Sequence, residues 1–144
     1  KEIDLFQSME SSSTTINEIN KNSKYFLKKL KYFNGEKESF YKKIKAQMVT
    51  LDGYIGEHNI NQIDFLKIDT EGYEFEILKG LKQNIFKVKL ILFEHHYDDM
   101  IKKNYTFSEI HNLLVENNFK RILKAKMPFR KTFEYIYTNN RKFN

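Results

Sequence analysis

Two short apolar runs on either side of a helical segment restrict the fold of this chain more than any other feature. Residues Ile63–Ile68 have the length and β-branched content of a buried strand, and the second run, residues 88–93, is interrupted only by Lys89. Residues 73–79 between them read as a helix, and Gly80 suits the cap at its end. A strand, helix and strand in this order predict two neighbouring parallel strands.

Elements on either side of this unit extend the same pattern. Residues 3–6 alternate as a short strand, and Thr106 with Glu109 three positions later forms a capping box that starts another helix. Residues 121–124 and 133–138 read as two last strands, whose short connection predicts an antiparallel pair. The order predicts an α/β fold, the C-terminal half of a doubly wound, Rossmann-like sheet that is mostly parallel with an antiparallel terminal strand.

The chain shows no counterpart of the first half of such a sheet. A doubly wound sheet normally carries a glycine-rich nucleotide-binding turn after its first strand, and the five glycines here are scattered without forming one. A βα unit takes about 30 residues, so roughly 90 residues of preceding sheet are expected. We therefore expect residues 1–144 to be a partial domain that lacks its N-terminal, cofactor-binding half.

The composition excludes several classes of protein. The chain has 144 residues, enough for one core, and no cysteine, which excludes a disulfide framework, a cysteine-based zinc site and a thiol nucleophile. No apolar run approaches the ~18 residues needed to span a bilayer, and no signal peptide is visible. We expect a soluble, cytoplasmic protein with no membrane span.

A lysine-rich segment supplies most of the formal net charge of +6. Within residues 16–45, apolar side chains recur at intervals of three and four, which predicts a helical segment with a basic outer face. Charge runs usually face water, so a solvated helix is the preferred interpretation. A phosphate-bearing or membrane-surface partner is the alternative, and nucleic acid is not the expected partner.

Acidic and histidine side chains follow both strands of the central unit. Asp69 and Glu71 come directly after the first strand, and Glu94, His95 and His96 follow the second apolar run. The carboxyl ends of parallel strands meet at one edge of an open sheet, where such folds bind their ligands. We expect these groups to converge there. Asp69, Glu94 and His95 could hold a divalent cation, or a histidine could act as a base.

The residues from Lys67 to Glu74, K-I-D-T-E-G-Y-E, resemble the core motif of the FkbM-type S-adenosylmethionine-dependent methyltransferases. Residues 50–55 before the motif, I-L-K-G at residues 77–80 after it and the strand that ends at Glu94 extend the resemblance. It implies a class I methyltransferase fold, S-adenosylmethionine as cofactor, and methyl transfer to a hydroxyl of a small-molecule acceptor such as a sugar. The motif lies in the C-terminal half of that domain, and the family's glycine-rich cofactor loop has no counterpart in this chain.

The chemistry of methyl transfer suggests roles for the residues at the acidic edge. Methyl transfer to a neutral hydroxyl needs a base, or a metal that lowers the pKa of the hydroxyl. Asp69, Glu71, Glu94 and His95 are therefore the candidate catalytic residues, and Asp69 is also a candidate cofactor ligand. The structural alternatives are that Asp69 caps the following helix and that Glu71 interacts with its dipole. The alternative function is a non-catalytic, basic α/β binding module for an anionic polymer or a protein partner.

Overall fold

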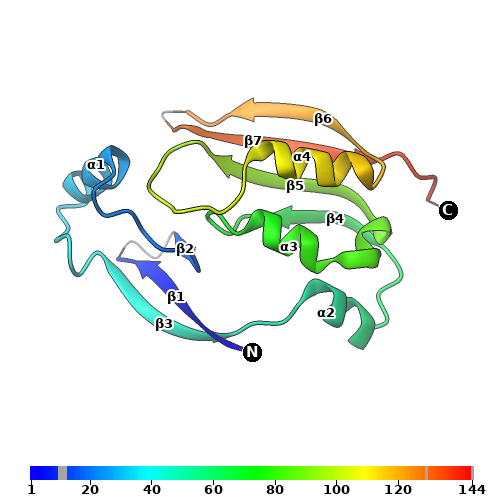
Figure 1. The fold of residues 1–144 in the computed structure, drawn as a ribbon, viewed down its shortest axis with the longest axis horizontal. Coiled ribbons are helices and arrows are strands. Elements are labelled where there is room, and N and C mark those ends of the chain that lie inside the picture. The colour runs from blue at the N-terminus through cyan, green and yellow to red at the C-terminus, as the bar shows by residue number, and fades with distance from the viewer. Residues whose placement is uncertain (10–12, 129, 144) are drawn as a thin grey trace.

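The computed structural model describes residues 1–9, 13–128 and 130–143, which form two β-sheets with helices beside them (Figure 1). The smaller sheet is antiparallel with the order β2-β1-β3, and the larger has the order β4-β5-β7-β6. The strands are β1 (Glu2–Ser8), β2 (Thr14–Thr15), β3 (Tyr41–Gln47), β4 (Ile63–Ile68), β5 (Val88–His96), β6 (Phe119–Lys126) and β7 (Thr132–Asn139). The helices are α1 (Lys24–Tyr32), α2 (Leu51–Glu57), α3 (Glu74–Gly80), the 3-10 helix η1 (Lys82–Lys87) and α4 (Phe107–Glu116). No helix in the described part of the chain is long and apolar enough to cross a membrane.

The larger sheet confirms the predicted parallel pair and corrects the rest of the prediction. β4 runs parallel to β5, with Phe65 opposite Leu90 and Ile68 opposite Phe93. β7 lies between β5 and β6 and is antiparallel to both. The expectation of a mostly parallel sheet is therefore wrong, since only the β4–β5 pairing is parallel among the described strands. The reason is that β7, which returns from β6 through a short connection, takes the place beside β5, so that both of its pairings are antiparallel.

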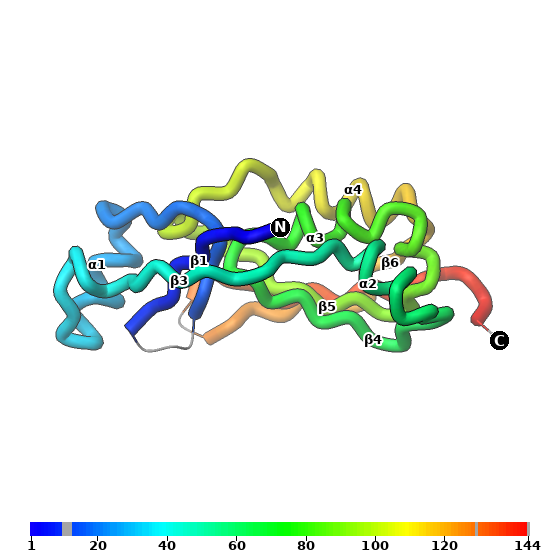
Figure 2. Tube along the Cα trace, turned by 90° about the horizontal axis from the view of Figure 1, so that it is seen from below, coloured from blue at the N-terminus to red at the C-terminus, as the bar shows by residue number. Residues whose placement is uncertain are grey.

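Helices α3 and α4 cover the same face of the larger sheet (Figure 2). Under them, the ring of Phe93 stacks with the rings of Tyr135 and Tyr137, and all three side chains are fully buried. The other buried members of this core are Ile55, Ile68, Leu78, Leu81, Ile85, Val88, Ile91, Ile110, Leu114 and Phe119. β4 is an edge strand, because within the described residues it pairs with β5 alone, and Phe65 is 53% exposed.

The lysine-rich segment is not one continuous helix. α1 occupies only the middle of the predicted range 16–45, and residues 41–45 belong to β3. Pairing with β1 gives this part of the chain its hydrogen-bond partners and opposite charges, and Nζ of Lys43 lies 2.7 Å from a carboxylate oxygen of Asp4. Helical periodicity in the sequence cannot reveal such a distant partner. α1 itself buries Phe26 in a second, smaller core with Phe40, Met100 and Ile101.

Candidate active site

The turn that follows β4 is held in shape by a buried carboxylate. Glu71 and Gly72 have positive φ angles of 51° and 99°. Glu74, at the start of α3, is 1% exposed, and its Oε1 accepts hydrogen bonds from the backbone N–H of Thr70 at 3.3 Å and of Gly72 at 2.9 Å. Its Oε2 accepts a hydrogen bond from the hydroxyl of Tyr105. Glu74 is therefore a positioning residue for the turn that carries Asp69 and Glu71.

The N-terminal segment fixes the same turn from the other side. The hydroxyl of Thr15 donates to the carbonyl of Glu71 at 2.8 Å, and Nδ2 of Asn17 donates to the carbonyl of Gly72 at 2.5 Å. A Cβ atom on Gly72 would lie 2.8 Å from the side chain of Ile101. The turn thus requires glycine both for its backbone angle and for space. As a result, Glu71 has one defined position relative to β5.

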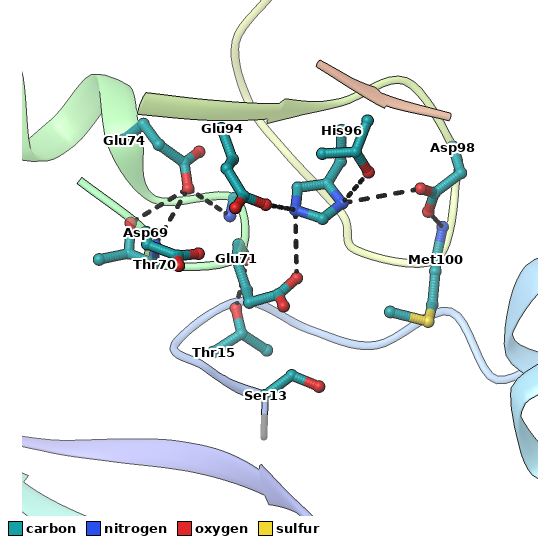
Figure 3. A network of polar contacts seen from close by, with 12 residues as sticks. Ser13, Thr15, Asp69, Thr70, Glu71, Glu74, Glu94, His96, Asp98 and Met100 are labelled. Carbon is teal, nitrogen blue, oxygen red and sulfur yellow. Dashed lines mark hydrogen bonds and ion pairs between the residues drawn. The ribbon is translucent and has the colours of Figure 1, made fainter. Parts of the chain in front are cut away.

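Glu71 and His96 form the centre of the site (Figure 3). Successive side chains of a strand point to opposite faces, so Glu94 and His96 share one face of β5. Nε2 of His96 lies 3.3 Å from Oε2 of Glu71 and 4.0 Å from Oε2 of Glu94. The three side chains are 16% exposed or less. Two of the predicted catalytic residues, Glu71 and Glu94, are therefore brought together, and the histidine beside them is His96.

Two further side chains contact the other nitrogen of the His96 ring. The hydroxyl of Thr132 on β7 lies 3.1 Å from Nδ1, and Oδ2 of Asp98 lies 3.8 Å from it. Asp98 is in turn fixed by the backbone N–H of Met100, which donates to Oδ1 at 3.0 Å. Nε2 has no hydrogen-bond partner within the described residues, although it is buried. The ring is thus contacted through Nδ1 by Thr132 and Asp98, while Nε2 faces the carboxylate of Glu71.

Burial and mutual repulsion shift the pKa values of these groups. Burial raises the pKa of the Glu71 carboxyl. Burial also raises the pKa of Glu94, and the negative charge of Asp69 adds to that effect. For His96, burial by itself lowers the pKa, but the carboxylates of Asp98 and Glu71 outweigh it, so that the pKa is raised. The site therefore concentrates negative charge around an imidazole that binds a proton more readily than usual.

His95, predicted as a catalytic residue, does not join this group. Its ring packs against those of Tyr97, Tyr105 and Phe107, with centroids 4.7, 5.9 and 5.7 Å away. The side chain is 4% exposed, and burial lowers its pKa to about 4. His95 and Glu94 are consecutive in a strand, so their side chains face opposite ways. The structure places the His95 ring among aromatic side chains rather than beside Glu71.

The three side chains of the predicted metal site do not come together in the structure. Asp69, Glu94 and His95 were expected to share a divalent cation, but the His95 ring lies on the other face of β5 from Glu94. Among the residues that the structure describes, no group of three or more His, Asp or Glu side chains is arranged to hold a metal ion. The arrangement around His96 instead resembles a hydrogen-bonded acid–base group.

Asp69 lies at the carboxyl end of β4, as predicted, but it is more exposed than Glu71. Its side chain is 40% exposed, and Oδ2 accepts a hydrogen bond from Nζ of Lys67 at 2.9 Å. It lines a mostly apolar cavity of about 490 Å³ between the smaller sheet and α3. Thr70 and Tyr73 line the same cavity. Asp69 does not cap α3, since the N-cap position belongs to Tyr73.

A second cavity, of about 620 Å³, contains the Glu71–His96 pair in its lining. Its other lining residues come from α1 and the loop after it, from the segment after β5, from the β6–β7 connection and from the residue just before β2. They are Ser13, Tyr25, Lys28, Lys29, Tyr32, Phe33, Met100, Pro128 and Arg130. Of the serine loop at residues 11–13, only Ser13 lies within the described residues. The buried imidazole is thus accessible from a cavity with a basic rim.

The sequence contained a signal for part of this network. Glu94, His96 and Asp98 are spaced two apart, and in a strand this spacing places side chains on one face. Glu94 and His96 lie in β5 and Asp98 lies just after it. The spacing therefore groups His96, and not His95, with the two carboxylates. No comparable signal identifies Thr132, which reaches His96 only through the antiparallel pairing of β7 with β5.

Comparison of the sequence with known families identifies the chain as a methyltransferase domain. Residues 3–121, well over half of the chain, match the family model of the methyltransferase FkbM domain. The protein belongs to the FkbM methyltransferase family, as the motif at residues 67–74 predicted. No curated protein and no solved structure matches the chain.

Proposed function

We propose that this protein is an S-adenosylmethionine-dependent O-methyltransferase that acts on a hydroxyl of a sugar or another small molecule. The observation that carries the proposal is the buried Nε2 of His96, which lines a cavity, has no hydrogen-bond partner within the described residues and lies beside Glu71. A hydroxyl that becomes methylated loses its proton, and a positioned imidazole is a common acceptor for it. In this proposal His96 takes the proton through Nε2.

The surrounding residues prepare His96 for that role. Thr132 and Asp98 lie on the Nδ1 side of the ring and orient it. Glu71 and Asp98 stabilise the imidazolium that forms when the proton arrives, since their negative charges favour the protonated ring. The raised pKa makes His96 a stronger base than an isolated imidazole. Glu74 acts indirectly, because it holds the turn that places Glu71.

The carboxylates at the sheet edge suit a cationic cofactor. Asp69, Glu71 and Glu94 lie close enough for their charges to influence one another, and the pKa values of Glu71 and Glu94 are both raised. A positively charged group nearby would relieve this repulsion. S-adenosylmethionine has an ammonium and a sulfonium, so Asp69, which lines the apolar cavity, is the residue we expect to face it. When bound, the cofactor supplies an electrophilic methyl group.

We further propose that residues 1–144 form the C-terminal half of a Rossmann-like class I domain. The support is the open edge of β4, which within the described residues has β5 as its one strand partner. The half-exposed Phe65 on this strand is unusual for an apolar run that reads as buried. Further strands beside β4 would cover it and would provide most of the cofactor site.

The alternative of a basic binding module has less support. Several lysines of the lysine-rich segment pair with acidic side chains in the structure. These pairs are Lys21–Glu38, Lys43–Asp4 and Lys45–Glu2. Acidic side chains therefore neutralise part of the positive charge of this segment. The acidic group around His96 has no evident role in a basic binding module.

The test uses the full-length protein, labelled S-adenosylmethionine and a panel of hydroxylated acceptors. We expect methyl transfer by the wild type and a loss of about a hundredfold in kcat for His96→Gln, the usual scale for a removed general base. His58→Gln is the matched control, because His58 is exposed and distant from the cavity lining, and it should keep wild-type turnover. Wild-type kcat in a folded His96→Gln protein would contradict the assignment of the base.

A further inference from the structure

The cavity above His96 is divided into an acidic inner part and a basic outer part. Glu71 and His96 have side chains that are 16% and 7% exposed, so they form the inner part. Lys28 and Arg130 are exposed and line the outer part. A ligand that enters therefore meets positive charge first and the proton acceptor last.

The basic part is assembled from two distant segments of the chain. Lys28 and Lys29 lie on α1, and Arg130 follows β6 in the connection to β7. Lys29 is anchored, since its Nζ donates to the hydroxyl of Ser13 at 2.7 Å. The positive charges of Lys29 and Arg130 both act to lower the pKa of Glu71, so the basic part of the cavity is close enough to influence the acidic part.

Lys28 and Arg130 have no carboxylate partner in residues 1–9, 13–128 and 130–143. None of the ion pairs of the described chain includes either side chain, unlike Lys21, Lys43 and Lys45. Two cations that line one cavity without a partner repel each other, and an anion between them removes that cost. A guanidinium also offers paired donors that match carboxylate or phosphate oxygens.

The aromatic lining suits the rest of such a ligand. Tyr25, Tyr32 and Phe33 line the same cavity, and the Tyr32 side chain is 81% exposed. Tyrosine combines an apolar ring face with a hydroxyl that can form hydrogen bonds, a combination that suits a small molecule with both apolar and polar faces. An exposed aromatic side chain at a cavity rim is available for a ligand to cover.

We propose that the methyl acceptor carries an anionic group, a carboxylate or a phosphate, which Lys28 and Arg130 bind while its hydroxyl faces His96. The inference rests on the proposed function only in identifying this ligand as the acceptor. The carboxylate of Glu71 keeps the anionic end out of the inner part, so the two parts of the cavity orient the ligand. Charge thus selects both the acceptor and the hydroxyl that is methylated.

The test measures binding without methyl transfer. Glucose, glucuronate and glucose 6-phosphate are titrated into the full-length protein by calorimetry at low ionic strength. We expect one or both anionic sugars to bind at least about tenfold more tightly than glucose, a preference that added salt weakens. A preference for glucuronate identifies the anion as a carboxylate, and one for glucose 6-phosphate identifies it as a phosphate.

Variants distinguish binding by the cations of the cavity from attraction by the overall positive charge of the protein. Lys28→Gln with Arg130→Gln should remove the preference, whereas Lys24→Gln with Lys42→Gln, which removes the same charge from exposed positions outside the cavity lining, should keep it. Equal binding of all three sugars by the wild type, or a preference that survives in the folded Lys28/Arg130 variant, would overturn the proposal. Anion binding without methyl transfer to any acceptor would instead contradict the proposed function alone.

Discussion

His95 allows a quantitative test of the different roles assigned to two adjacent histidines. Its ring is 4% exposed, lies among Tyr97, Tyr105 and Phe107, and leaves Nδ1 without a hydrogen-bond partner in the described structure. Burial disfavours the charged form of the ring and lowers its pKa from 6.5 to about 4. The folded protein therefore binds this proton much less readily than the unfolded chain.

The sign and size of the effect follow from this difference. Between about pH 6.5 and pH 4, His95 is protonated in the unfolded chain and neutral in the folded protein. Its contribution to the free energy of unfolding is thus complete above pH 6.5 and is lost as the pH falls towards 4. One pH unit corresponds to about 1.4 kcal/mol, so the full loss is about 3 kcal/mol.

We predict that His95→Phe removes this dependence. At about pH 7.5 its free energy of unfolding should lie within about 1.5 kcal/mol of the wild type, because the ring is replaced by one of similar size among aromatic neighbours. At about pH 4.5, the free energy of unfolding of the variant relative to that of the wild type should be higher by at least about 2 kcal/mol than it is at about pH 7.5. Urea denaturation at both pH values gives the two differences, and comparison at equal pH cancels the other titrating groups.

His58→Phe is the control, because the His58 side chain is exposed and its substitution should produce no such relative gain at low pH. If wild type and His95→Phe lose stability in parallel as the pH falls, the ring of His95 is not buried in its neutral form. That outcome would contradict both the lowered pKa of His95 and its placement among the aromatic side chains.

Three further predictions concern the turn, the sheet edge and the proposed base. Glu74→Ala should lower the free energy of unfolding by about 3 kcal/mol in urea denaturation, since it leaves buried backbone donors unpaired, and Glu74→Gln by less than half of that. Asp69→Asn should change the free energy of unfolding by no more than about 1 kcal/mol, because its ion pair is partly exposed, and should reduce methyl transfer about a hundredfold. Asp64→Asn is the control, because Asp64 is an exposed, ion-paired residue on the same strand, and it should keep wild-type turnover. The kcat of the wild type should rise with pH as His96 loses its proton, and the midpoint of this rise should lie above pH 6.5. Asp98→Asn should lower the midpoint, and an unchanged midpoint would contradict the role of Asp98.

Local patterns in the sequence determined the central unit of the fold. The apolar runs became β4 and β5 in parallel register, and the pair Thr106 and Glu109 became the predicted capping box at the start of α4. Gly72 adopts the positive φ angle expected of a glycine in a tight turn. These features depend on residues close together in the chain, whose hydrophobic spacing and side-chain hydrogen bonds act over a few positions.

Tertiary structure decided which residues form the site. Alternation along the strand groups His96 with Glu94, but only the pairing of β5 with its neighbours decides that this face, and not the face of His95, meets the turn after β4. Thr132 comes to His96 from β7, and the cations of the cavity rim come from α1 and from the β6–β7 connection. Contacts between segments so far apart leave no periodic signal in the sequence, because they arise from the packing of whole elements rather than from the spacing of neighbouring residues.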